Sequence, residues 1–132
     1  MITRVTCAVI EQYARVLITQ RSKSMPDPLL WEFPGGKVEA GETEEECLVR
    51  EIREELSLHI TPQFRMTPVL HQLGDNPALE LIPFRCLYDG GTIQLLEHRN
   101  YKWVHPQDLL DHDWCAPDIP VVEEYLRLLK AS

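Results

Sequence analysis

The chain has 132 residues and a formal net charge of −8 at pH 7, and 44% of its residues are hydrophobic. This length supports one hydrophobic core and is too short for two ordinary domains, so we expect a single domain over residues 1–132. The acidic composition argues against a nucleic-acid polymer as partner, because phosphate backbones attract basic surfaces. A small anionic ligand would need a metal ion to bridge it to such a protein.

Two strands are predicted near the N-terminus, where apolar and polar residues alternate. They cover Ile2–Glu11 and Ala14–Gln20 and are joined by a tight turn at 11–13. Ser22–Leu30 contains two prolines and is predicted to be a loop near a site entrance. Trp31–Phe33 is predicted to be a short strand that leads into a glycine turn.

A helix is predicted to start near Thr43, because Thr43 and Glu46 form a capping-box pattern and the acidic first turn suits the helix dipole. One side of the helix is apolar and can pack on a core. It carries Leu48, Val49, Ile52 and Leu56. A neighbouring arc about 100° wide gathers carboxylates. They are Glu44, Glu51, Glu54 and Glu55.

The clustered carboxylates indicate a divalent metal site. Two like charges about 4 Å apart repel by ~4 kcal/mol at an effective dielectric constant of about 20, a large part of the roughly 5–15 kcal/mol that stabilises a small domain. A cation would neutralise the cluster, and all-oxygen ligands favour Mg²⁺ or Mn²⁺. The competing interpretation is a surface helix with solvated glutamates, which does not explain the glycines before the helix.

The segment after the helix is predicted to be mostly extended. His59–Gln72 forms an extended stretch, and Gly74–Pro77 forms a turn. Leu79–Tyr88 is the next predicted strand, after which Asp89–Thr92 turns the chain back. Pro83 predicts an edge position or a bulge in this strand, because proline cannot donate a ladder hydrogen bond.

The C-terminal part is predicted to hold a strand at Tyr101–Val104, a short helix from Pro106–Leu110 and an amphipathic helix at Ile119–Lys130. The inward side of the last helix consists of Val122, Tyr125, Leu126 and Leu129. The predicted order of elements is β-β-β-α-β-β-β-α, which is an α+β pattern. No Cys-x-x-Cys pair and no stretch long enough to span a membrane are present, so we expect reduced thiols and a cytoplasmic protein without a membrane partner.

Eight residues of the helical region match a long motif. The pattern is Gly-x5-Glu-x7-Arg-Glu-aliphatic-x-Glu-Glu-x-Gly-aliphatic, and the matching residues are Gly36, Glu42, Arg50, Glu51, Ile52, Glu54, Glu55 and Leu58. This run resembles the Nudix box. The single departure is Ser57, which replaces a glycine that serves a C-terminal turn with positive φ.

The resemblance extends beyond the box and is closest to the MutT-like branch. The segment 30–37 leads into the box as in that branch, Arg21 lies eleven residues before Glu32, and Glu97 lies six before Trp103. Residues 116–120 precede the last helix in the same way. The resemblance implies the Nudix fold, which is a mixed β-sheet sandwiched between helices.

The resemblance also implies the metal ligands and the catalytic groups. Glu54 and Glu55 would be ligands, while Glu51 would be either a ligand or the general base. One backbone carbonyl would come from Gly35 or Gly36. Glu97 would be a further ligand or an alternative base, with a solvated loop charge as the other interpretation. Arg50 would orient Glu51 through a charge-assisted hydrogen bond.

Substrate contacts are implied for Arg21, Glu32, Lys37, Phe84 and Asp118. Arg21 would bind a phosphate or the nucleotide edge, or would be a surface arginine. Asp118 would accept hydrogen bonds from a base, or would cap the helix that begins at Ile119. Phe84 would stack on the base or pack in the core, and the same alternatives apply to Trp114. No role is assigned to His71, His98, His105 and His112, which show no ligand spacing.

The resemblance implies hydrolysis of a nucleoside triphosphate to the monophosphate and pyrophosphate with Mg²⁺ or Mn²⁺. In this branch water attacks the β-phosphorus, and the substrates include 8-oxo-dGTP and CTP with its 5-substituted forms, so the expected role is sanitation of the nucleotide pool. The alternatives are an inactive Nudix domain that binds or senses nucleotides, and a hydrolase of another nucleoside diphosphate derivative. A monomer or weak homodimer is expected.

Overall fold

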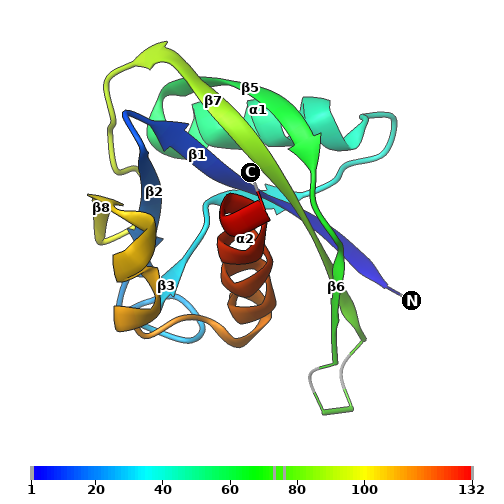
Figure 1. Ribbon diagram of the computed structural model, residues 1–132. Coiled ribbons are helices and arrows are strands. Elements are labelled where there is room, and N and C mark those ends of the chain that lie inside the picture. The colour runs from blue at the N-terminus through cyan, green and yellow to red at the C-terminus, as the bar shows by residue number, and fades with distance from the viewer. Residues whose placement is uncertain (1, 73, 76, 132) are drawn as a thin grey trace.

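The computed structural model describes residues 2–72, 74–75 and 77–131. One mixed sheet with two helices makes up the fold (Figure 1). The elements in chain order are β1 (Thr3–Gln12), β2 (Arg15–Gln20), β3 (Trp31–Glu32), β4 (Gly35–Lys37), α1 (Glu44–Leu56), β5 (Leu58–Arg65), β6 (Val69–His71), β7 (Leu79–Gly91), β8 (Asn100–Val104) and α2 (Ile119–Ala131), with short 3-10 helices at Pro106–Asp111 and Ala116–Asp118 before α2.

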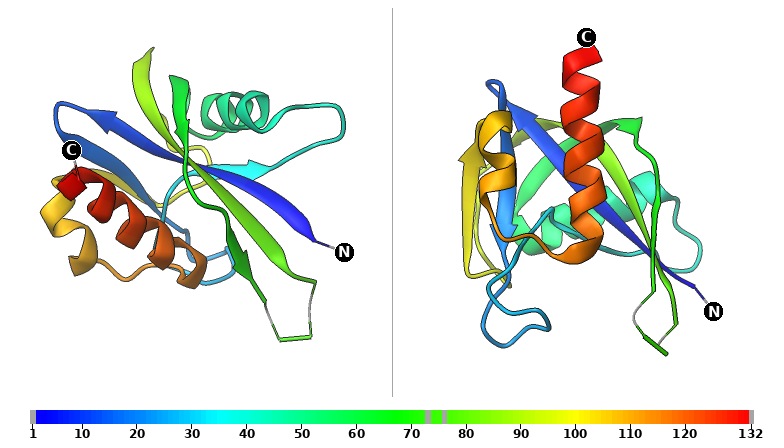
Figure 2. Two further views of the ribbon diagram at one scale, coloured as in Figure 1. Left: turned by 45° about the vertical axis from the view of Figure 1, so that its right-hand side comes forward. Right: turned by 60° about the horizontal axis from the view of Figure 1, so that its bottom comes forward.

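The sheet has the strand order β3-β2-β1-β7-β5, with β4 paired to β1, β6 to β7 and β8 to β2. β1 and β7 run parallel, and the other pairs are antiparallel. Figure 2 shows α1 on one face of the sheet and α2 on the other. The expected mixed sheet between helices is therefore confirmed. None of the helices within the described ranges is long and apolar enough to span a membrane.

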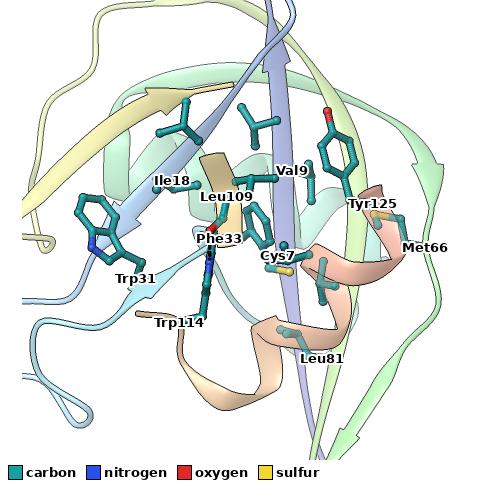
Figure 3. Packing of buried hydrophobic residues seen from close by; sticks show 14 residues of the cluster. Cys7, Val9, Ile18, Trp31, Phe33, Met66, Leu81, Leu109, Trp114 and Tyr125 are labelled. Atoms are coloured by element: carbon teal, nitrogen blue, oxygen red, sulfur yellow. Dashed lines mark hydrogen bonds between the residues drawn. The ribbon is translucent and has the colours of Figure 1, made fainter. Parts of the chain in front are cut away.

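Each face of the sheet has its own apolar cluster, because side chains along a strand alternate between faces. On β1, Cys7 and Val9 pack in the cluster that includes α2 residues such as Tyr125 (Figure 3). Ala8 and Ile10 pack in the cluster that includes α1. The sheet thus serves as the middle layer that fixes the position of α1.

Two predicted turns differ from the structure. The first hairpin turns at Tyr13 and Ala14, which both have positive φ, and not at 11–13. The predicted turn at Asp89–Thr92 is wrong, because β7 continues to Gly91 and pairs with β5. Positive φ at Gly90 and Gly91 and a register shift between His59 and Ile60 mark a bulge there. A turn and a bulge can both be built from the same glycine-rich sequence, so the sequence alone could not distinguish a turn from a bulge at these residues.

The edge position predicted for Pro83 is wrong, since β7 lies between β1 on one side and β5 and β6 on the other. The sheet accommodates this proline at an interruption in the neighbouring strand. The predicted extended stretch 59–72 is divided into β5 and β6, and between them Met66 donates its backbone N–H to the Pro83 carbonyl at 2.8 Å. Of the predicted turn at 74–77, Gly74 and Asp75 form a turn, and Asn76 lies outside the described residues.

Both ends of α1 are capped. Thr43 and Glu46 form the predicted capping box. At the C-terminal end Ser57 has φ 58° and ψ 30°, and its N–H donates to the Arg53 carbonyl at 3.0 Å. The left-handed conformation that a glycine would adopt freely is therefore imposed on a serine.

We predict that Ser57→Gly stabilises the protein by about 1 kcal/mol, because an L-residue with a Cβ is strained by roughly that amount in the left-handed region. Urea denaturation should show a higher midpoint for this variant. Ser57→Ala is the control, since it keeps the Cβ and removes only the hydroxyl. An equal gain for both variants would contradict the assignment of strain to the backbone.

Candidate active site

The two glycines before α1 lie in an extended strand and not in the predicted turn. β4 pairs with β1, so that Gly36 lies opposite Thr6 and Gly35 lies opposite Cys7. A Cβ on Gly36 would lie 2.2 Å from the carboxyl carbon of Glu51, and one on Gly35 would lie 1.9 Å from the Thr6 carbonyl oxygen. Glycine is therefore required at 35, where a Cβ would meet the backbone of β1, and glycine at 36 leaves room for the Glu51 carboxylate directly beside β4.

The ladder between β1 and β4 distinguishes the two glycine carbonyls. Ala8 donates its N–H to the Pro34 carbonyl at 2.8 Å, and Val38 donates to the Arg4 carbonyl at 3.0 Å. Hydrogen-bonded pairs alternate along an antiparallel ladder, so the Gly36 carbonyl faces β1 and the Gly35 carbonyl faces away from it. Of the two alternatives from the sequence, Gly35 therefore has the carbonyl that is available to a metal ion.

Arg50 holds the glutamates of α1 in place. Its guanidinium binds both oxygens of Glu42, at 3.0 and 2.7 Å, and donates to Glu51 at 2.9 Å and to Glu54 at 3.2 Å. The hydrogen bonds from Arg50 lower the pKa of Glu42 to about 2. The contact between Arg50 and Glu51 expected from the sequence is present, and Glu42 serves as its anchor.

Glu55 is buried in an unusual state. Glu55 is 8% exposed, and its Oε2 atom is buried without a hydrogen-bond partner in the described part of the chain. Burial raises the pKa of Glu55 to about 9, and the charges of Glu51 and Glu97 add to the rise. Burial also raises the pKa of Glu51, against the hydrogen bonds from Arg50 that lower it.

Glu97 comes from the segment between β7 and β8, far from α1 in sequence. Its charge acts on both Glu51 and Glu55, and Leu96 donates its N–H to the Glu55 carbonyl at 3.3 Å. The structure therefore brings the predicted Glu97 to the carboxylates of α1. Glu44, from the same predicted arc, instead binds Arg65 at the start of the helix, at 2.7 Å.

These groups fit a hard divalent cation. An unpaired buried carboxylate is costly, and a cation would compensate it. The available oxygens are those of Glu51, Glu55 and Glu97, the carbonyl of Gly35, and Glu54, whose side chain is 57% exposed at the rim. Across the described ranges the side chains do not form a ready-made cluster of three or more His, Cys, Asp or Glu ligands. Small side-chain rotations would therefore accompany binding.

A cavity of about 600 Å³ adjoins Glu55. It extends from the loop after β2 to the start of α2, and its lining includes Arg21, Glu32, Phe33, Trp114 and Asp118. Phe33 and Trp114 pack with ring centroids 4.9 Å apart (Figure 3), and the Trp114 Nε1 donates to the Leu109 carbonyl at 2.7 Å. A cavity with aromatic walls and a few polar groups is suited to a flat heterocycle.

Asp118 is buried at this cavity and accepts a hydrogen bond from the Phe33 backbone N–H at 2.9 Å. This bond joins the start of α2 to β3, which differs from the predicted helix cap. Burial raises the pKa of Asp118 to about 8, although the bond from Phe33 lowers it. In its protonated form Asp118 can donate as well as accept, in contrast to the acceptor-only aspartate expected from the sequence.

Three other predicted substrate contacts have different outcomes. Arg21 lines the cavity and donates to Glu32 at 2.7 Å. Lys37 is exposed at the end of β4, where its carbonyl accepts a hydrogen bond from Arg50 at 3.3 Å. The assignment of Phe84 to the substrate is wrong, because this residue is 4% exposed and packs in the core cluster beneath α1.

His98, to which no role was assigned, is buried and bonds to Glu32 at 2.8 Å. The sequence offers one signal for it, which is its place next to Glu97. Histidines are common in cores, so this position alone would not have distinguished it. The partner, Glu32, lies 66 positions earlier and becomes visible only in the folded chain.

Comparison with known proteins agrees with this geometry. The family model "NUDIX domain" matches residues 1–125. The chain is 32% identical to the CTP pyrophosphohydrolase of Escherichia coli (strain K12) over 127 residues, covering 96% of this chain and 93% of the relative. It is 35% identical to the putative 8-oxo-dGTP diphosphatase 2 of Mycobacterium tuberculosis (strain CDC 1551 / Oshkosh) over 132 residues, covering 97% and 91%.

A solved structure is similar over nearly the whole chain. The crystal structure of the MutT protein from Methanosarcina mazei Go1 superposes with a TM-score of 0.86 at 26% identity, covering 98% of this chain and 96% of that one. The strand order, the carboxylates of α1 and the sequence matches agree with one another. The chain therefore belongs to the Nudix family, and its sequence and fold are similar to those of MutT-like members.

Proposed function

We propose that this protein is a divalent-metal-dependent hydrolase that cleaves a nucleoside triphosphate to the monophosphate and pyrophosphate. The observation that carries this proposal is the buried Glu55 side chain, whose Oε2 atom has no hydrogen-bond partner among the described residues, beside a cavity with aromatic walls. The cavity would hold the base, and the carboxylates would hold the metal ion that meets the phosphates. Mg²⁺ is the first candidate and Mn²⁺ the second.

The proposed ligands are Glu54, Glu55, Glu97 and the Gly35 carbonyl. A bound divalent ion supplies positive charge to the phosphates and lowers the pKa of a water molecule. Arg50 fixes Glu51 beside β4, where Glu51 acts either as a further ligand or as the base that takes the proton from water. Glu97 is the alternative base. An active hydrolase is favoured over an inactive binding domain because the carboxylates of the Nudix box are all present.

The base is the part of the substrate that the cavity would select. A protonated Asp118 donates through its hydroxyl and accepts through its carbonyl oxygen, so it would pair with an edge that offers both an acceptor and a donor. Cytosine and oxidised guanine both have such edges, and the two relatives are named CTP pyrophosphohydrolase and putative 8-oxo-dGTP diphosphatase 2. We propose sanitation of the nucleotide pool as the role, with derivatives of nucleoside diphosphates as the competing substrates.

We predict that Glu51→Gln and Glu54→Gln each lower kcat by about 10²-fold or more and change KM much less, because these groups act on the metal ion and water. Pyrophosphate release should be measured across the natural and oxidised nucleoside triphosphates, with and without a chelator. Glu45→Gln is the control, since Glu45 is exposed on the same helix. Near-native rates in both variants would favour a binding domain instead.

Another prediction concerns the effect of Glu55 on the pH dependence of stability. Its pKa is raised from the ordinary value of 4.5 to about 9, so the metal-free protein should lose stability as the pH rises through this interval. Glu55→Gln removes this loss and should melt at a higher temperature than the wild type at pH 8 in a chelator. The same variant should show a much smaller rise in Tm with Mg²⁺. A full Mg²⁺ response in Glu55→Gln would contradict the assignment of Glu55 as a ligand.

The third prediction separates the two possible roles of Asp118. Asp118→Asn can still accept the Phe33 N–H and presents an amide donor in place of the hydroxyl, so its Tm and its ranking of bases should both stay near those of the wild type. Asp118→Ala should lower the Tm, raise KM for the best substrate by about tenfold and change the ranking of bases. An unchanged ranking of bases in Asp118→Ala would leave Asp118 with only its bond to the Phe33 N–H.

A further inference from the structure

The segment that carries Glu97 has no regular secondary structure between the end of β7 and the start of β8. Backbone hydrogen bonds tie it to its surroundings on both sides of Glu97. Gln94 donates to the Leu56 carbonyl at 3.0 Å, and Arg99 donates to the Gln20 carbonyl at 2.9 Å. Glu97 itself faces the like charges of Glu51 and Glu55, which oppose its approach to α1.

His98 supplies a side-chain anchor inside this segment. Its side chain is 1% exposed, and its Nε2 atom lies 2.8 Å from Oε2 of Glu32. Because an ionised carboxylate only accepts, Nε2 carries the hydrogen of this bond. The other oxygen of Glu32 accepts from Arg21 at 2.7 Å. Glu32 thus joins β3, the loop after β2 and the segment of Glu97.

We propose that His98 is a positioning residue, which holds Glu97 in the metal-ligand set through its bond to Glu32; this inference rests on the proposed metal-dependent function. The bond lies next to the residue that must approach two like charges. A buried ring fixed at Nε2 limits the positions that the adjacent Glu97 backbone can take. Groups that orient metal ligands from outside the first shell typically affect metal affinity or activity by about 10–100-fold.

The hydrogen bonding of the His98 ring supports a role in orienting Glu97 over a role in stability alone. Its Nδ1 atom is buried without a hydrogen-bond partner among residues of the described ranges. A buried polar atom without a partner costs stability, so a leucine of similar size would serve a packing role better. The single directed bond to Glu32 is the feature that leucine cannot reproduce.

The test is Mn²⁺ binding to the nucleotide-free protein, measured by the electron paramagnetic resonance signal of free Mn²⁺. His98→Leu should weaken Mn²⁺ binding about tenfold. It should lower kcat with little change in KM for the nucleotide. His98→Gln should restore most of the affinity, because its amide nitrogen takes the place of Nε2. His98→Asn should not, because its amide nitrogen takes the place of Nδ1.

Tyr125→Phe is the matched control. It removes a buried hydrogen bond of similar length, from the Tyr125 hydroxyl to Glu11 at 2.7 Å, in the core on the α2 side. It should lower the Tm and leave Mn²⁺ affinity unchanged. If His98→Leu does not fold, the comparison of His98→Gln with His98→Asn still decides the question.

Two results would overturn the inference. One is wild-type Mn²⁺ affinity in His98→Leu, and the other is equal affinity in the Gln and Asn variants. Failure of the wild type itself to bind Mn²⁺ would overturn the proposed function as well, so the two failures can be distinguished.

Discussion

The burial of the Glu55 carboxyl group beside the charges of Glu51 and Glu97 is the constraint on which the site depends. Glu55 lies on the side of α1 that packs on the sheet, among apolar residues such as Leu56 and Ile52. In this place the ionised form is strongly disfavoured unless a cation is present. In return for this energetic cost, the core fixes the direction of the Glu55 side chain. The side chain of a glutamate on the surface would not be fixed in this way. Stability of the helix and reactivity of the site are therefore coupled at one residue.

The remaining parts of the site follow from the need to bring charged groups close to Glu55. Glycine at 36 leaves room for the Glu51 carboxylate beside β4, and an alanine there would displace that carboxylate. Arg50 compensates the neighbouring carboxylates and is itself fixed by Glu42, so a single guanidinium orders most of the box. The spacing of the motif thus has a geometric meaning, because it brings together the short strand β4, the Arg50 guanidinium and one face of α1.

The metal site and the cavity share a wall. Glu32 carries a charge that acts on both Glu55 and Asp118, and it is bonded to Arg21, which lines the cavity, and to His98, which lies beside Glu97. A triphosphate that places its base near Asp118 would extend past Glu32 toward the carboxylates of α1. In this arrangement the depth of base binding would determine where the phosphates meet the metal site.

The sequence by itself determined the helix, its capping box and the carboxylates that share one face, because these depend on local spacing along 3.6 residues per turn. It also indicated Glu97, through a family resemblance. Only the tertiary structure decided that Gly35 and Gly36 form a strand, that Phe84 is core, and that His98 reaches Glu32. It also decided the bulge at Gly90 and Gly91 and the burial of Asp118, which raises the pKa of this residue. These features depend on contacts between segments far apart in the chain and on burial, neither of which a local pattern can specify.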